Sequence, residues 1–185
     1  DALDLVEILK LRVEKALDGT KVDEVAVRKI AAYASRDTGD ARKAVELLAK
    51  AAEVAEEGTG ILGIDQVDLA ERRLEVDKTS ELIQALAPQQ HLALRACYGA
   101  LQSERRRLST GLAYTWYHRL CGEEGTKPLT QRRFSEMVSF LDLYGLVNAP
   151  VSSRGRFGKT REISGALSHE VVVTMLRSDV PANKV

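Results

Sequence analysis

The sequence has little of several residue patterns that define whole classes of protein. Its 185 residues include two cysteines, too few for a disulfide framework, and no metal ligands cluster around Cys97 or Cys121. No apolar run approaches the roughly 18 residues that span a bilayer. No positively charged start leads into an apolar stretch, as it does in a secretory signal. These absences favour a reduced, cytoplasmic, soluble protein with no membrane partner.

Motifs for catalysis are also missing. The sequence contains no GxxxxGK[ST] or GxSxG pattern, and the glycine-rich segment 58–63 lacks the lysine of a phosphate-binding loop. The three histidines share no spacing that is typical of a metal site. We therefore expect no catalytic residues, no metal site and no enzyme activity in this chain by itself.

Charge is distributed unevenly along the chain. Residues 1–88 contain 13 basic and 19 acidic side chains, a net of −6, whereas residues 89–185 contain 14 and 8, a net of +6. Pro88 lies at the seam and disfavours helix in the residue before it. This asymmetry predicts two domains, residues 1–87 and 88–185, the second of which faces a polyanion.

The first of these domains is predicted to be almost entirely helical. Apolar residues recur at helical spacing in four segments, and Asp40 and Asp65 stand where the caps of the last two helices are expected. Short connections between helices favour a bundle. The pattern predicts a small four-helix bundle with helices over residues 5–17, 23–33, 41–57 and 66–86.

The second domain has a different pattern. Three helical segments, near residues 89–102, 110–121 and 131–144, precede two β-prone stretches that flank Gly155 and Gly158. Three helices followed by a hairpin make a winged helix, and residues 166–177 are expected to form a closing helix. The predicted fold class is therefore mostly α: a helical bundle followed by a winged-helix domain with a β-hairpin wing.

The third helix of this domain carries the first candidate binding residues. Thr130 is placed to cap it, and its exposed first turn carries Gln131, Arg132 and Arg133, with Ser135 on the flank. The first turns of this helix enter the major groove in a helix-turn-helix, and Arg and Gln form bidentate bonds with guanine and adenine. The alternative is that the two arginines only increase solubility.

The hairpin carries the second set of candidate residues. Arg154, Arg156, Lys159 and Arg161 place four cations within eight residues, with no acidic residue among them. A phosphate backbone or a narrow minor groove relieves such self-repulsion. Gly155 and Gly158 are expected to let the tip approach DNA closely, and Phe157 is expected to pack at its base or to touch sugars. The alternative is a basic loop without a role.

Four segments together resemble the AAA+ replication initiators of the archaeal origin-recognition and Cdc type. The segments are Asp4-Leu5-Val6-Glu7-Ile8-Leu9 with Arg12, Gly39-Asp40-Ala41-Arg42-Lys43-Ala44-Val45-Glu46-Leu47-Leu48, Pro128-Leu129-Thr130-Gln131-Arg132-Arg133-Phe134 and Gly155-Arg156-Phe157-Gly158-Lys159-Thr160-Arg161. The resemblance implies a lid domain and a winged helix, without the ATPase base that precedes them in this family. It also implies a nucleoid-associated protein that binds double-stranded origin DNA and helps to load the replicative helicase.

By the same resemblance, Arg42 is the sensor-2 arginine of the lid. This residue reaches the phosphates of ATP or ADP, bound with magnesium, in the intact protein. Its helical angle places it opposite the Ala44–Leu48–Ala51 stripe. The alternative, which we expect to describe it in this chain, is a surface arginine paired with Glu46 one turn later.

Three other functions remain open at this point. One is a winged-helix transcription regulator whose helical half dimerises or senses a ligand. Another is an ATPase that works without a recognisable phosphate loop. The third is a winged helix that contacts protein only.

Overall fold

The computed structural model describes residues 2–17, 21–37, 40–58, 60–103, 108–153 and 159–177. The chain divides into two compact units, Asp1–Lys78 and Thr79–Val185. The division falls inside one continuous helix, α4 (Ile64–Gln84), whose last turns belong to the second unit. The boundary expected between residues 87 and 88 lies in the short connection after this helix.

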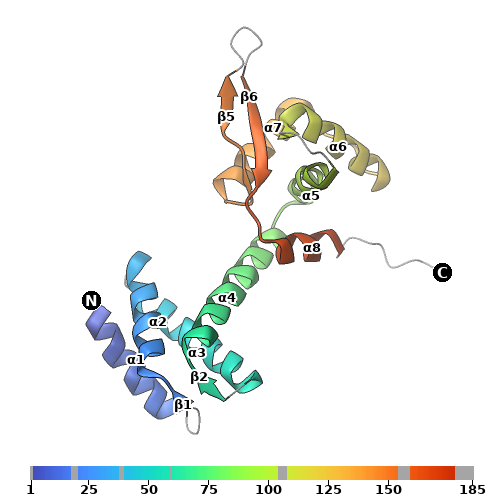
Figure 1. Cartoon of the computed structure of the whole chain (residues 1–185). Coiled ribbons are helices and arrows are strands. Elements are labelled where there is room, and N and C mark those ends of the chain that lie inside the picture. Colours follow the sequence, from blue (N-terminus) through green and yellow to red (C-terminus); the bar gives the residue numbers. More distant parts are fainter. Residues whose placement is uncertain are drawn as a thin grey trace, which may run out of the picture. The chain divides into compact units, whose positions relative to one another are not determined.

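The first unit is built from helices, as the periodicity predicts (Figure 1). In addition to the first turns of α4, they are α1 (Ala2–Ala16), α2 (Glu24–Asp37) and α3 (Ala41–Glu57). Two short strands, β1 (Lys21–Val22) and β2 (Ile61–Leu62), pair in parallel. Strand β1 was not predicted from the sequence, because two residues are too short to show an alternating pattern.

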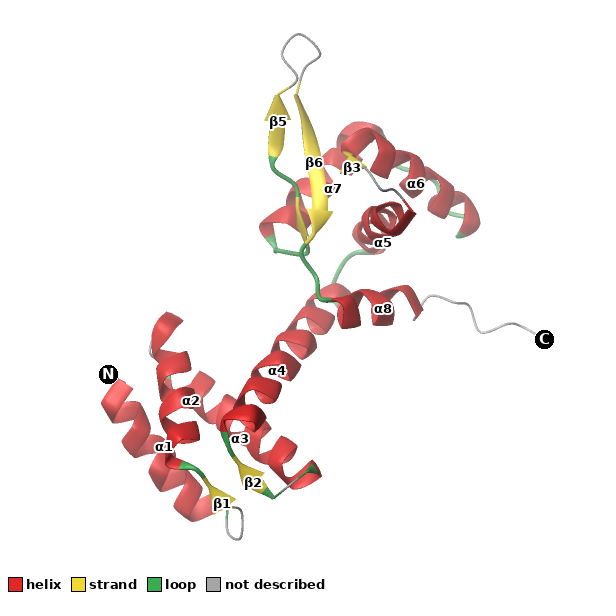
Figure 2. Ribbon diagram, in the orientation of Figure 1, coloured by secondary structure: helices red, strands yellow, loops and turns green. Residues whose placement is uncertain are grey.

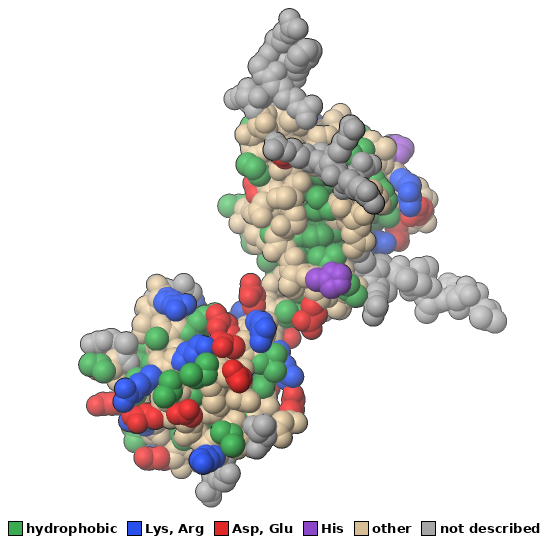
Figure 3. Space-filling model, in the orientation of Figure 1, with side chains coloured by type: hydrophobic (Ala, Val, Ile, Leu, Met, Phe, Trp, Pro, Cys, Tyr) green, Lys and Arg blue, Asp and Glu red, His purple; other side chains and the backbone are tan. Residues whose placement is uncertain are grey.

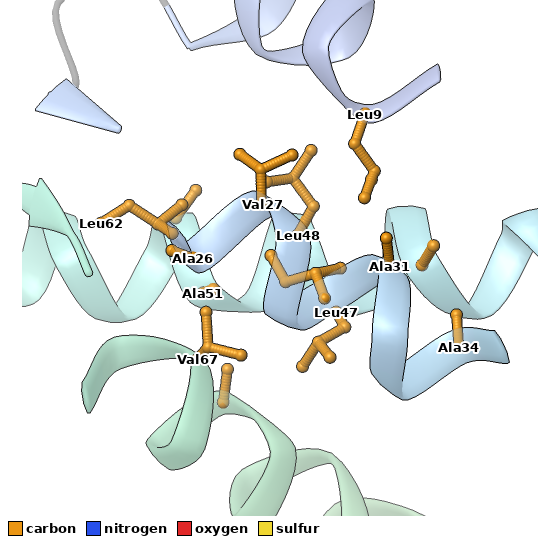
Figure 4. Close-up of a cluster of buried hydrophobic side chains, with 14 of the residues drawn as sticks. Leu9, Ala26, Val27, Ala31, Ala34, Leu47, Leu48, Ala51, Leu62 and Val67 are labelled. Atoms are coloured by element: carbon orange, nitrogen blue, oxygen red, sulfur yellow. The ribbon is translucent and has the colours of Figure 1, made fainter. Parts of the chain in front are cut away.

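The core of the first unit is a cluster of leucines and alanines. Figure 4 shows Leu9 of α1, Val27 of α2, Leu48 of α3 and Val67 of α4 turned toward the same interior. The small side chains of Ala26, Ala31, Ala34, Ala44, Ala51 and Ala55 are buried as well. Because alanine adds little bulk, the helices approach one another closely.

The N-terminal ends of α3 and α4 test the two predicted caps. Asp40 caps α3, where its carboxylate accepts the N–H of Arg42 at 2.9 Å, so this prediction is confirmed. The prediction for Asp65 is wrong, because α4 already begins at Ile64. The N–H of Gly63 donates to Oε1 of Gln66 at 3.1 Å, and in this way Gln66 closes the helix start in place of an aspartate.

Ion pairs account for much of the charge on the first unit. Glu24 contacts Lys10 at 3.0 Å and Arg28 at 3.1 Å, and Glu57 contacts Arg73 at 2.7 Å. On the face shown in Figure 3, basic and acidic side chains of this unit lie interspersed. On this face the acidic side chains of the first unit therefore lie next to basic ones and do not form a separate acidic patch.

The second unit has the element order of a winged helix (Figure 2). Its elements are α5 (Pro88–Ser103), β3 (Leu108–Ser109), α6 (Thr110–Glu123), α7 (Gln131–Leu143), β4 (Val147–Asn148), β5 (Val151–Ser153), β6 (Lys159–Gly165) and α8 (His169–Arg177). The long strand β6 is central, because β3, β4 and β5 all pair with it in antiparallel register. The predicted winged helix is confirmed, although α8 begins three residues later than expected.

A buried tyrosine fixes the base of the wing. The hydroxyl of Tyr98, on α5, donates to the carbonyl of Leu146 at 2.8 Å and accepts the N–H groups of Ala166 and Leu167 at 3.0 and 2.9 Å. One side chain thus joins the segments before β4 and after β6 to the core helix. Because these bonds satisfy backbone groups at both ends of the wing, its direction is set by the core.

None of the helices in the described ranges combines the length and the apolar character needed to cross a membrane.

Candidate nucleic-acid interface

Helix α7 is held by its apolar side and presents its first turn to solvent. Phe134, Val138 and Leu141 are fully buried. Thr130 caps the helix by accepting the N–H of Arg133 at 3.4 Å, as predicted. The first turn then exposes Gln131, Arg132 and Arg133, and Ser135 is half-buried beside them.

The segment before α7 is anchored by two tyrosines of α6. Tyr114 donates its hydroxyl to the carbonyl of Leu129 at 2.9 Å, and Tyr117 accepts the N–H of the same residue at 3.1 Å. Tyr117 donates in turn to the side-chain oxygen of Gln89. Both rings pack against Phe134, with centroids 5.6 and 5.0 Å away. The residue before the Thr130 cap is therefore fixed on both of its backbone groups.

Burial raises the pKa of Tyr117 to about 12. The hydroxyl therefore keeps its proton well into the alkaline range and can donate to Gln89 while it accepts from Leu129. A deprotonated phenol could not donate to Gln89. The shift and the two bonds together describe a stable support for the start of α7.

Both arginines of the first turn share one carboxylate. Arg132 is 90% exposed and its Nε lies 3.4 Å from one oxygen of Glu136. Arg133 is 71% exposed and donates to the other oxygen at 2.9 Å. The bond from Arg133 is the main reason that the pKa of Glu136 lies below its usual value. The acidic partner of both arginines thus comes from their own helix.

An open groove of about 360 Å³ lies beside this turn. Its lining comes from α6, α7 and the two strands of the wing: Thr110, Gly111, Gln131, Ser135, Val151, Thr160 and Arg161. The pairing of β3 with β6 brings the start of α6 to the wing, where the N–H of Arg161 donates to Thr110 at 3.4 Å. The hydroxyl and amide groups in this lining can donate hydrogen bonds to phosphate and sugar oxygens.

Three of the predicted site residues therefore meet at one place. Gln131 and Ser135 of α7 precede Arg161 of the wing by at least 26 positions, yet all three line the same groove. Arg132 and Arg133 stand on the same helix turn as Gln131. The arrangement can hold an extended polyanion between α7 and the wing.

The side chain of Arg161 also serves the fold. It is 24% exposed, and its NH1 donates to the carbonyl of Ala149 at 2.6 Å and to Asp142 at 3.3 Å. The other oxygen of Asp142 accepts the N–H of Ala149 at 2.8 Å. Asp142 was not among the residues predicted from the sequence. One signal was available, since Asp142 is the single acidic residue between positions 137 and 161.

The tip of the wing lies outside the described residues. This applies to Arg154, Gly155, Arg156 and Phe157, whose predicted DNA contacts stay predictions. Lys159 begins β6 and its backbone pairs in register with Ser153. The hairpin that was expected to carry these residues is formed by β5 and β6.

Arg42 is exposed near the start of α3, as its helical angle predicts. The alternative pairing with Glu46 is not formed among the described residues, where the carboxylate of Glu46 contacts Lys78 of α4 at 3.1 Å. A single exposed guanidinium does not form a binding site for ATP. Within the described ranges, no three His, Cys, Asp or Glu side chains are grouped as metal ligands would be.

Comparison with known proteins gives two family matches. Residues 81–175 match the C-terminal winged helix domain of CDC6, and residues 6–72 match the Cdc6 AAA+ ATPase-type lid domain. The two matches follow the two compact units of the structure.

Curated relatives and a solved structure agree with these matches. The chain is 39% identical over 178 residues to the ORC1-type DNA replication protein 1 of Sulfolobus acidocaldarius, which covers 96% of this chain and 45% of the relative. It is 37% identical over 180 residues to the ORC1-type DNA replication protein of Pyrococcus furiosus, which covers 97% and 43%. The structure of the Aeropyrum pernix ORC1 protein in complex with DNA is similar with a TM-score of 0.81 at 36% identity, over 97% of this chain and 47% of that one. The chain thus spans less than half the length of these relatives.

Proposed function

The chain belongs to the Cdc6 and ORC1-type family of DNA replication proteins, and we propose that it binds double-stranded DNA at replication origins through its winged helix. In this proposal the first turn of α7 enters the major groove and the wing lies along the backbone and the minor groove. The two contacts are independent, because base edges specify a sequence and phosphates position the protein.

The observation that carries the proposal is the convergence of α7 and the wing on one groove. Gln131 and Ser135 of α7 line it together with Thr160 and Arg161 of β6. Arg132 and Arg133 project from the adjacent turn into solvent. A side chain that is free to leave the surface can reach a base edge without disturbing the fold.

The charge of the second half supports the same proposal. Residues 89–185 carry a net charge of +6, and four of their cations fall between positions 154 and 161. The similar ORC1 protein of Aeropyrum pernix was solved in complex with DNA. Neutralisation of phosphates by such cations releases counterions, which provides affinity for any duplex.

Two further roles belong to the proposal on the family resemblance. Arg42 would sense ATP or ADP held by another part of a longer protein, and its exposed position on α3 supports this. The protein would also help to load the replicative helicase. The groove and the arginines of α7 concern neither role.

Titration with duplex DNA tests the proposal. We expect the chain to bind a 24-base-pair duplex of mixed sequence with a Kd of roughly 1–100 μM near physiological salt, and to bind more tightly as salt is lowered. Replacing Arg132 and Arg133 together with alanine should weaken binding.

A matched control comes from the first unit. Lys10 and Arg28 also share one carboxylate, that of Glu24, and both are exposed. Replacing these two with alanine removes the same charge from a surface without a proposed role, and it should leave binding unchanged. Absence of binding at 50 mM salt, or equal loss in the two double variants, would contradict the proposal.

A further inference from the structure

Glu136 occupies the surface of α7 that carries the two arginines. Its two oxygens contact different partners, Arg132 at 3.4 Å and Arg133 at 2.9 Å. The carboxylate is 47% exposed, so it faces solvent on the same side as the arginines. Of the three charges grouped at this place, two are positive and one is negative.

The stability of the helix does not explain this arrangement. Cations in a first turn oppose the helix dipole, and an arginine placed before a glutamate is the weaker order for such a pair. Exposed ion pairs of this kind also contribute little to folding. An acidic residue in the first turn, as Glu24 provides in α2, would stabilise a helix start better. The first turn of α7 has none.

The presence of a carboxylate on a DNA-facing surface has a direct consequence. A duplex of any sequence brings phosphates toward Glu136, which repels them. Each arginine also gives one of its N–H donors to Glu136, and that donor must leave the carboxylate before it can contact DNA. Phosphate contacts gain little from this exchange, because one carboxylate–arginine contact is traded for a similar phosphate–arginine contact.

A guanine edge offers more to an arginine. Its O6 and N7 accept two parallel hydrogen bonds from one guanidinium, a geometry that Glu136 does not provide to either arginine here. We propose that Glu136 is a specificity-determining residue of α7, which weakens binding to unmatched duplexes by competing for Arg132 and Arg133. This inference rests on the proposed DNA binding and deepens it. Specificity arises here from an unfavourable group, in addition to the favourable contacts.

Glu24 of the first unit provides a matched comparison. It also accepts from two exposed cations, Lys10 at 3.0 Å and Arg28 at 3.1 Å, and it is 55% exposed. The pKa of Glu24 lies below its usual value for the same reason, namely hydrogen bonds from its two cations, with Lys10 contributing most. The two carboxylates therefore differ mainly in the surface on which they stand.

The experiment compares Glu136→Gln with Glu24→Gln in the 185-residue chain. Binding is measured by fluorescence anisotropy from 50 to 250 mM KCl. The probes are a 24-base-pair duplex of mixed sequence and a duplex that the unmodified chain has selected from a random pool. Circular dichroism and urea unfolding establish that both variants are folded.

We expect Glu136→Gln to bind the mixed duplex about three- to tenfold more tightly, with the slope of log K against log salt steeper by about one. Binding to the selected duplex should tighten less, so that the ratio of the two affinities falls. Glu24→Gln should stay within about twofold of the unmodified chain on both probes, because its surface has no proposed contact with DNA.

Three outcomes would overturn the inference. Unchanged binding of the mixed duplex by Glu136→Gln is the first. The second is weaker binding of the selected duplex with no gain on the mixed one, which would make Glu136 a direct contact to a cytosine amino group. The third is an equal gain in Glu24→Gln, which would be a general charge effect. If the unmodified chain binds neither duplex, the proposed function itself fails.

Discussion

Arg161 of β6 and Asp142 of α7 form an ion pair that connects the wing to the last turn of the helix that we propose to face DNA. The guanidinium and the carboxylate are 3.3 Å apart, and both also bind the backbone of Ala149, which lies between β4 and β5. The angle between α7 and the wing is therefore set before any DNA arrives. Such preorganisation reduces the ordering that binding would otherwise require.

Removal of this tie should lower the stability of the second unit. Asp142→Ala leaves the N–H of Ala149 without its acceptor and Arg161 without its carboxylate, and we expect a loss of about 1–2 kcal/mol. Asp142→Asn retains an oxygen for Ala149 and should lose less. Urea unfolding followed by circular dichroism measures both values.

The control for this prediction is Glu123→Ala. Glu123 pairs with Arg119 on the exposed side of α6, at 2.9 Å, and among the described residues it forms no ion pair with the wing. Its removal should lower stability by about 0.3–0.5 kcal/mol. A loss as small as this in Asp142→Ala would mean that the ion pair with Arg161 does not support the wing.

Local signals made most of α7 predictable. Thr130 caps the helix, and Phe134, Val138 and Leu141 face the core. Both features were predictable because each depends on residues within one or two helical turns of each other. The position of Glu136 beside Arg132 follows from the same helical repeat. The structure adds that Glu136 divides its two oxygens between Arg132 and Arg133.

Local sequence patterns do not predict which residues meet in long-range contacts. The partner of Arg161 is 19 positions away on another element, and nothing local distinguishes this arginine from the other wing cations. The anchoring of Leu129 by Tyr114 and Tyr117 also depends on the path of the chain between α6 and α7, which the local sequence does not specify. The start of α4 was predicted wrongly for a different reason. Gly63 and Gln66, three residues later, form the helix start that was expected at Asp65.

Alkaline pH should destabilise the folded chain through buried thiol and phenol groups. Burial raises the pKa of Cys97 to about 12, and that of Tyr117 also to about 12. In the unfolded chain these groups ionise near pH 8.5 and 10. Between those values and pH 12 the folded state therefore binds more protons than the unfolded state, so stability falls as the pH rises.

The size of this effect can be measured for Cys97 alone. Each group that has ionised only in the unfolded chain lowers stability by about 1.4 kcal/mol per pH unit. We expect the free energy of urea unfolding to fall by about 2 kcal/mol between pH 7.5 and 10 from Cys97. Cys97→Ala should show a fall that is smaller by that amount. Identical pH profiles for the two proteins would show that the thiol ionises equally easily in both states.

Arg132 should contribute more to sequence discrimination than to general affinity. Its side chain is 90% exposed, so Arg132→Ala should leave the fold intact. Loss of a bidentate contact to guanine reduces discrimination between bases by about 1–3 kcal/mol. The measurement is the ratio of affinities for a duplex selected from a random pool and for a mixed-sequence duplex.

Arg119→Ala is the control for Arg132, since it removes an exposed arginine from the neighbouring helix α6. It should change neither affinity by more than about twofold, because distant surface charges are screened. If Arg132→Ala weakens both duplexes equally, Arg132 contacts phosphate and the sequence is recognised by other groups.

The cations of the wing should act on all duplexes alike. Arg156 and Lys159 belong to the run between positions 154 and 161, where no acidic residue offsets them. If both contact phosphates, replacing them together with alanine should weaken binding to every duplex and reduce the slope of log K against log salt by about two. The double variant Lys10→Ala with Arg28→Ala, which removes two cations from the first unit, should keep the original slope.

An unchanged slope in the wing variant would exclude Arg156 and Lys159 from contact with phosphate, because each phosphate contact that is lost must return its counterion to the DNA. The wing would then be a support for α7 alone, held in place by Arg161 and Asp142.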